Sequence, residues 1–262
     1  MEVHDSPVKY AAITEKGNFA VTYSSFRQGT AKLWSLETMQ CKASVESAHG
    51  QSMCCLKDRL LLGSREGPIK VWDISVSTPV ALLDLQGHRS VVVSIAASET
   101  HNVVLSGSRD VQLRLWDVRT GMSVRTMEGH TNTVTSVGMD SACGIGISGS
   151  FDKTVMTWDL GTGKCIDTFQ HEQEVFEVGI RETGSTFFSH DGDYCLRIFS
   201  TADAGHKATK TVNLKATCGV QKPHNTTNAF WDMKVAAKRD LSCFATSFRT
   251  ISHNSSKSMM WQ

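Results

Sequence analysis

Residues 88–118 read HRSVVVSIAASETHNVVLSGSRDVQLRLWDV. Residues 91–97 and 103–108 are rich in β-branched and aliphatic side chains, residues 113–118 alternate apolar with polar ones, and residues 123–127 form a fourth short run. Turn-forming residues such as Arg119-Thr120-Gly121 separate these runs. Short runs of this kind at regular spacing predict a four-stranded antiparallel sheet. One such sheet cannot bury both of its faces alone, so we expect copies of the unit to stack.

Aromatic residues show that this unit is repeated along the chain. Equivalent runs end in Trp34, Trp72, Trp116, Trp158 and Phe199, at spacings of 38, 44, 42 and 41 residues. Trp261 follows only after another 62 residues, which predicts an insertion in the last repeat. A period in this range is typical of propellers and solenoids rather than of single compact sheets.

Histidines and aspartates repeat with the same period. His88, His130 and His171 each precede the aromatic residue of their repeat by 28 residues. Each is followed 22 residues later by an aspartate, and these are Asp110, Asp152 and Asp193. Two fixed spacings held across three repeats indicate one structural unit used three times.

These residues resemble the repeats of the WD40 (transducin-β-like) family, strongly from Gly50 to Phe199 and weakly towards both ends. The resemblance implies an all-β protein: a β-propeller with six recognisable blades, the first and last incomplete, either as a ring of its own or as part of a seven-bladed ring. We expect one domain over residues 1–262, with blades at residues 4–46, 49–86, 88–128, 130–170, 171–214 and 224–262. The ring could be six-bladed with weak closure, open and completed by a partner, or a fragment of a longer protein, and we favour the last.

The resemblance also assigns the repeated polar residues to a structural network. In the family, a histidine, a serine of the second strand, a turn aspartate and a tryptophan form a hydrogen-bonded chain. The implied sets are His88/Asp110/Trp116, His130/Asp152/Trp158 and, in part, His171/Asp193, with Ser106 or Ser108 and Ser148 or Ser150 as the serines. A buried network with every group satisfied stiffens its surroundings. We therefore interpret these residues as structural and not as catalytic triads.

Composition excludes several functional classes. The chain has 27 Lys+Arg against 26 Asp+Glu and a formal net charge of +1, so there is no strong signal for nucleic acid. No apolar run approaches the roughly 20 residues of a membrane span, and the first residues do not read as a signal peptide. The eight cysteines form no C-x-x-C pair. We expect no metal, no cofactor and reduced, buried thiols in an intracellular protein, cytoplasmic or nuclear.

The candidate binding residues stand just before the turn acids. These positions hold Arg27, Arg65 and Arg109 in three successive repeats and Phe151 in the fourth. In the family, this turn opens on the ligand-binding face, so the resemblance implies a cationic arc beside an aromatic residue. Arginine and aromatic residues are common interface anchors. The alternative is that the arginines are simply solvated surface charges.

A second candidate is Trp116-Asp117-Val118-Arg119. This segment resembles the WDxR box of substrate receptors that dock on the adaptor of cullin-RING ubiquitin ligases, with Arg119 as the docking residue. The pattern is complete in one repeat only, and such short motifs match often by chance.

The leading prediction is a non-catalytic scaffold or adaptor that binds other proteins through the propeller faces. The alternative is a ubiquitin-ligase substrate receptor that docks through Trp116, Asp117 and Arg119. A hydrolase or nucleotide-binding enzyme is a third hypothesis, but no nucleophile–base pair stands outside the repeated pattern. We expect no membrane partner and no small-molecule ligand.

Overall fold

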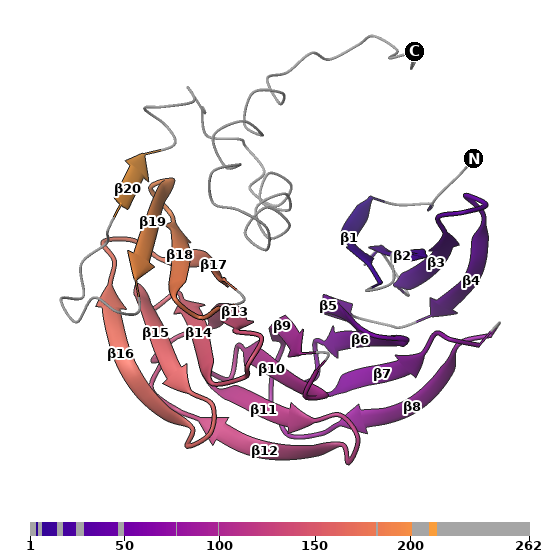
Figure 1. Ribbon diagram of the computed structural model, residues 1–262, viewed down its shortest axis with the longest axis horizontal. Coiled ribbons are helices and arrows are strands. Elements are labelled where there is room, and N and C mark those ends of the chain that lie inside the picture. The colour runs from indigo at the N-terminus through magenta and orange to yellow at the C-terminus, as the bar shows by residue number, and fades with distance from the viewer. Residues whose placement is uncertain are drawn as a thin grey trace, which may run out of the picture.

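A computed structural model describes residues 4, 7–14, 18–24, 29–46, 50–76, 78–98, 100–181, 183–200 and 210–213. These residues form five four-stranded antiparallel sheets, the blades of a β-propeller. The blades follow one another around an arc, with β1, β5, β9, β13 and β17 on its inner side (Figure 1). Within the described ranges, no helix is long and apolar enough to cross a membrane.

Each blade is a meander of four strands that runs from the inner side of the arc to its outer side. Blade 1 contains β1 (Val8–Ile13), β2 (Phe19–Ser24), β3 (Thr30–Ser35) and β4 (Cys41–Glu46), and blade 2 contains β5 (Gly50–Leu56), β6 (Arg59–Ser64), β7 (Ile69–Asp73) and β8 (Val80–Leu85). Blade 3 contains β9 (Val92–Ser98), β10 (Val103–Ser108), β11 (Leu113–Asp117) and β12 (Met122–Met127), and blade 4 contains β13 (Val134–Met139), β14 (Ile145–Ser150), β15 (Thr154–Asp159) and β16 (Lys164–Gln170). Blade 5 contains β17 (Val175–Ile180), β18 (Thr186–Asp191), β19 (Cys195–Ser200) and β20 (Lys210–Asn213).

Three sequence-based expectations need comment. The first blade is not incomplete, because Val8–Ile13 supplies its inner strand and the sheet has all four strands. The expected sixth blade, residues 224–262, lies outside the described residues. The six described cysteines are free thiols, but none is buried as expected: Cys41 and Cys165 are exposed because they lie on the outer strands of blades 1 and 4, and the other four are half-buried.

A line of hydrogen bonds crosses blade 3 from its core to its turn. The Trp116 indole N–H donates to Ser106 Oγ at 2.8 Å, and His88 Nε2 lies 2.8 Å from the same oxygen. His88 Nδ1 lies 2.8 Å from Asp110 Oδ2. Since an indole can only donate and a carboxylate can only accept, Ser106 Oγ accepts from Trp116, and the His88 Nδ1–H donates to Asp110. Ser106 and Trp116 are fully buried, so this serine is out of reach of any substrate.

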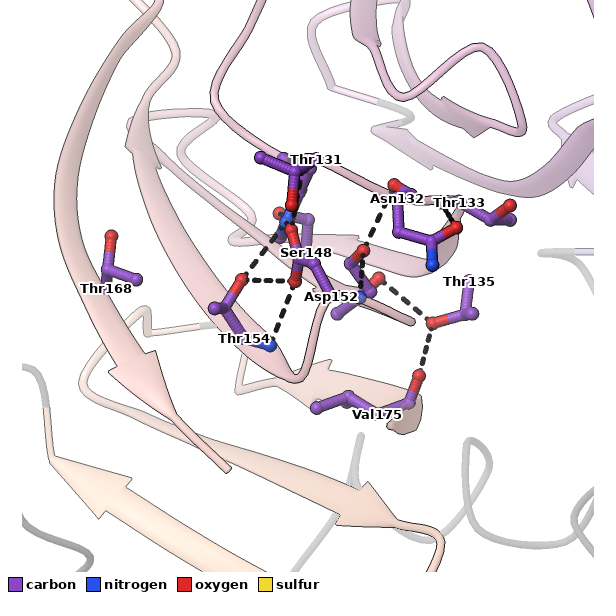
Figure 2. Close-up of polar contacts among 12 residues, drawn as sticks. Thr131, Asn132, Thr133, Thr135, Ser148, Asp152, Thr154, Thr168 and Val175 are labelled. Carbon is purple, nitrogen blue, oxygen red and sulfur yellow. Dashed lines mark hydrogen bonds and ion pairs between the residues drawn. The ribbon is translucent and has the colours of Figure 1, made fainter. Parts of the chain in front are cut away.

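Blade 4 repeats the arrangement with equal geometry. Trp158 Nε1 donates to Ser148 Oγ at 2.8 Å, and His130 bridges Ser148 and Asp152 at 2.7 and 2.8 Å. Asp152 also accepts the Thr131 N–H and the Thr154 hydroxyl (Figure 2). The network therefore fixes the turn after β14 as well as the blade core.

Blade 5 departs from the predicted network. His171 pairs with Asp191 at 3.2 Å, and the assignment of Asp193 was wrong. Asp191 occupies the strand-end position held by Ser108 and Ser150 in blades 3 and 4. One of its oxygens accepts the N–H groups of Asp193 and Cys195, while the other reaches His171. Asp191 thus takes the place of both the strand-end serine (Ser108 or Ser150) and the turn aspartate (Asp110 or Asp152) of blades 3 and 4.

Blade 2 lacks the network because Leu62 stands where blade 3 has Ser106. Leu62 pairs across the sheet with Lys70, as Ser106 pairs with Arg114. The Trp72 indole N–H consequently finds no hydrogen-bond partner within the described part of the chain.

Neighbouring blades interlock through glycines. A Cβ on Gly107 would lie 2.5 Å from Val134 Cγ1 and 2.8 Å from Val137 Cγ1, both on the next blade. Gly149 stands in the same relation to Val175 and Val178. The junction of blades 1 and 2 has the large and small residues exchanged. Tyr23 stands at the position of Gly107, and Gly50 stands at the position of Val134. Each junction therefore pairs one bulky residue with one glycine.

We predict that Gly107→Ala destabilises the protein while Gly144→Ala does not. The added methyl group of Gly107→Ala meets two valines in a close-packed junction, which costs about 1–3 kcal/mol in the free energy of unfolding. At Gly144, the nearest heavy atom to an added Cβ is 3.8 Å away. Urea unfolding measures both, and equal stabilities of the two variants would contradict this account of the junction.

We further predict that Asp110 contributes an acid-sensitive part of the stability. Burial alone would raise the pKa of Asp110, but hydrogen bonds from His88 and from the Arg89 and Gln112 N–H groups outweigh it and lower the pKa to about 2. Because the folded pKa lies below the unfolded value of about 3.9, this stability is present above pH ~4 and is lost as the pH falls towards ~2.

The measurement is urea unfolding of wild type and Asp110→Asn across this pH range. The expected difference is on the order of 2 kcal/mol near neutral pH and shrinks as the pH falls towards 2. Asp193→Asn, an exposed aspartate outside the network, is the matched control. A difference for Asp110→Asn that stays constant with pH would show that the carboxylate charge is unimportant.

Candidate functional site

One face of the propeller carries the turns between the second and third strands of the blades. Because the strands are antiparallel, these turns lie at the same end as the starts of the inner strands. Arg65, Arg109 and Phe151 lie in the β6–β7, β10–β11 and β14–β15 turns, on three successive blades. We call this the turn face. Arg27 lies outside the described residues.

In blades 3, 4 and 5, the backbone holds the turn residue against the start of the inner strand of its own blade. The Arg109 N–H donates to the Val91 carbonyl at 2.9 Å, and the Phe151 N–H donates to the Thr133 carbonyl at 3.0 Å. The Gly192 N–H makes the same bond to Glu174. Two residues further on, Val111, Lys153 and Tyr194 each have a positive φ, between 60° and 68°. The three turns therefore share one conformation, and only the side chain differs.

A β-bulge at the start of every inner strand presents a second side chain. The register shifts leave one extra residue in each strand, and these residues are Lys9, Gln51, Val93, Thr135 and Phe176. Bulges re-aim side chains at the ends of strands. The bulge residues, the turn residues Arg65, Arg109, Phe151 and Gly192, and the exposed loop residues Glu172 and Glu174 together form what we call the inner rim of the turn face.

The inner rim is cationic at blades 1 and 2. Lys9 Nζ donates to Gln51 Oε1 at 3.0 Å and lies 5.0 Å from the centroid of the Tyr10 ring. Burial, and after it the positive charge of Arg65, lowers the pKa of Lys9. Within the described ranges, neither Lys9 nor Arg65 makes an ion pair. Lys9 and Arg65 are thus close enough to repel each other, and neither is paired with a carboxylate among the described residues.

The inner rim is aromatic at blades 4 and 5. The rings of Phe151 and Phe176 meet edge to face, with centroids 5.6 Å apart. Phe176 is 42% exposed, which is unusual for a phenylalanine in a strand. Gly192 lies beside it, and a Cβ there would be 3.4 Å from the Phe176 ring. This aromatic pair is an apolar surface on the same face as the arginines.

Acidic residues lie beside the aromatic pair. Glu172 and Glu174 are exposed in the loop that enters β17, and Glu174 is tied to the turn of blade 5 through its carbonyl. Charge on the turn face therefore changes from positive to apolar to negative around the inner rim.

Sequence reasoning missed Lys9 and Phe176. Both stand five residues after a repeat histidine, His4 and His171, as Val93 and Thr135 do after theirs. The spacing was available, but an apolar or basic residue near the start of a strand gives no sign that a bulge will turn it outwards.

The segment 116–119 lies at the opposite end of blade 3. Trp116 is fully buried, whereas the side chain of Arg119 is 69% exposed. Asp117 accepts the Arg119 N–H at 2.9 Å and pairs with its guanidinium at 3.3 Å. Asp73 and Asp159 cap the equivalent turns in blades without an arginine there. The capping of the turn therefore accounts for the presence of Asp117. Of Trp116, Asp117 and Arg119, only Arg119 has a largely exposed side chain.

Among the described residues, no group of three or more His, Cys, Asp or Glu side chains could hold a metal ion.

The profile of the family described as "WD domain, G-beta repeat" (WD40) matches residues 79–117 and 121–159. The chain therefore contains two segments that match the WD40 repeat. Each matched repeat covers the outer strand of one blade and the first three strands of the next. The two matched repeats therefore span the junction of blades 2 and 3 and the junction of blades 3 and 4.

Several relatives match parts of the chain. Ribosome biogenesis protein YTM1 of Scheffersomyces stipitis is 33% identical over 135 residues, 48% of this chain and 28% of that protein. Kinesin-like protein KIF21B of Homo sapiens is 27% identical over 108 residues, 39% of this chain and 6% of that protein. Angio-associated migratory cell protein of Homo sapiens is 28% identical over 101 residues, 37% of this chain and 23% of that protein. The matched part is less than a third of each relative.

Proposed function

We propose that this chain is a non-catalytic scaffold that binds another protein through the turn face. One observation carries the proposal: arginines and an aromatic pair lie together on consecutive blades of one face, and the arginines have no ion-pair partner in the described ranges. Arginine and aromatic residues dominate the binding energy of many protein interfaces. A face whose charge changes sign along its rim selects partners by complementary charge.

The repeated Ser, His and Asp residues support the absence of catalysis. Ser106 and Ser148 are fully buried, and each oxygen is occupied by an indole N–H. The names of the relatives refer to different processes, so the proposal rests on the surface and not on any one relative. The free thiols fit a reducing compartment inside the cell.

We do not extend the proposal to adaptor docking through Arg119. Trp116 is inaccessible, Asp117 is needed by its turn, and the Arg119 guanidinium already pairs with that aspartate. An Arg119 variant nevertheless makes a good control because it changes the same charge on the other face.

We predict that Arg65→Glu combined with Arg109→Glu abolishes capture of the partner. Both side chains are exposed, so the melting temperature should not change. Affinity purification from cells, followed by mass spectrometry, compares wild type, this double variant and Arg119→Glu. Proteins that are lost with the double variant and retained with Arg119→Glu identify the turn-face partner.

Two results would overturn the proposal. One is a folded double variant that captures the same proteins as wild type. The other is loss of the partners with Arg119→Glu alone, which would move the binding site to the opposite face.

A further inference from the structure

The two cations at the junction of blades 1 and 2 are held in place by the fold. The Tyr10 hydroxyl donates to the Gln51 carbonyl, and the Gly50 N–H donates to the Tyr23 hydroxyl at 2.8 Å. These bonds join β1 and β2 of blade 1 to β5 of blade 2, so the bulge residues Lys9 and Gln51 lie side by side and form their 3.0 Å hydrogen bond. Lys9 is thereby ordered before any ligand arrives.

This arrangement favours an anion. Arg65 acts on both Lys9 and Tyr23 electrostatically, which places its charge near the same junction. Half-burial of Lys9 weakens its hydration, and the neighbouring positive charge adds repulsion. A negative group bound between Lys9 and Arg65 would relieve both costs. Glu66, the next residue after Arg65, is exposed and makes no ion pair with it.

The order of surfaces along the inner rim specifies more than an anion. After the cationic residues of blades 1–3, which include Arg109, come Phe151 and Phe176 on blades 4 and 5, which offer an apolar contact. The exposed acids Glu172 and Glu174 lie beside Phe176, in the loop that enters blade 5. A small anion would use only the first of these surfaces. An extended peptide with a charge at each end and an apolar side chain between them would use all three.

We propose that the inner rim binds an extended protein segment that places an Asp or Glu carboxylate at Lys9 and Arg65, an apolar side chain on Phe151 and Phe176, and a basic residue at Glu172 and Glu174. This inference rests on the proposed function and names the chemistry of the partner. A carboxylate suits the site because an arginine binds it through two parallel hydrogen bonds while a lysine adds a point charge.

The test uses the full chain and fluorescent synthetic peptides in a polarisation titration. One probe carries glutamates at one end, a central leucine and phenylalanine, and lysines at the other end. A second probe has the same composition with the acidic and basic residues intermixed, and a third has phosphoserine in place of glutamate. We expect the first probe to bind roughly tenfold more tightly than the second, a difference of about 1.4 kcal/mol.

Reversing the charge of Arg65 and of the acidic end of the probe tests whether these two groups contact each other. Arg65→Glu should weaken the first probe about tenfold, and replacing the glutamates of that probe by lysines should restore binding to this variant. Phe176→Ala should weaken binding without changing the preference for the charged ends. Lys164→Glu, the same kind of charge change at the start of the outer strand β16, should have no effect.

Equal binding of the segregated and intermixed probes would overturn the inference, as would no binding of either. Tighter binding of the phosphoserine probe than of the glutamate probe would replace the carboxylate by phosphate. If no probe binds, but Arg65→Glu combined with Arg109→Glu still abolishes partner capture, the turn face is the binding site and the proposed peptide class is wrong. If both fail, the proposed function fails too.

Discussion

The structure depends on one line of hydrogen bonds in each regular blade, from a tryptophan through a serine and a histidine to an aspartate. In blade 3, it joins Trp116, deep in the core, to Asp110, at the turn. The aspartate also accepts backbone N–H groups, so the loop that enters the blade and the turn after the second strand are fixed together. Because these interactions use buried groups and backbone, the side chain at position 109 or 151 is not needed for stability and is free to serve recognition.

A second constraint governs the junctions between blades. Gly107 and Gly149 make room for valines of the next blade, and Tyr23 with Gly50 achieves the same fit with the sizes reversed. On blade 5, His190 and Glu177 occupy the positions of Gly149 and Ser136, and both are buried. Burial lowers the pKa of His190 to about 4, so this histidine is neutral near pH 7. This face of blade 5 is therefore built differently from the corresponding faces of blades 2–4.

The sequence predicted the blades well because their spacing is set by local rules. A hairpin needs turn residues, a blade needs alternating apolar strands, and the network needs its residues at fixed intervals. The sequence-based prediction was wrong where a different side chain of the same repeat makes the expected hydrogen bond. Asp193 has the same spacing from His171 as Asp110 has from His88, yet Asp191 makes the bond. Asp191 stands where blades 3 and 4 have a serine, and it also accepts the N–H groups of Asp193 and Cys195. Lys9 and Phe176 were missed for another reason: their exposure depends on bulges, which involve pairing between strands and leave no local pattern.

The central claim is that buried polar chains and glycine junctions maintain the fold, while the variable residues of the inner rim determine binding. Hydrogen exchange of the free protein and of its complex with a partner captured in cells tests this most directly. The account predicts that binding slows exchange in the turns around residues 64–68 and 108–112 and at the start of β17, and leaves the turns at residues 118–121 and 160–163 unchanged. Protection confined to the latter turns would contradict it and place recognition on the opposite face.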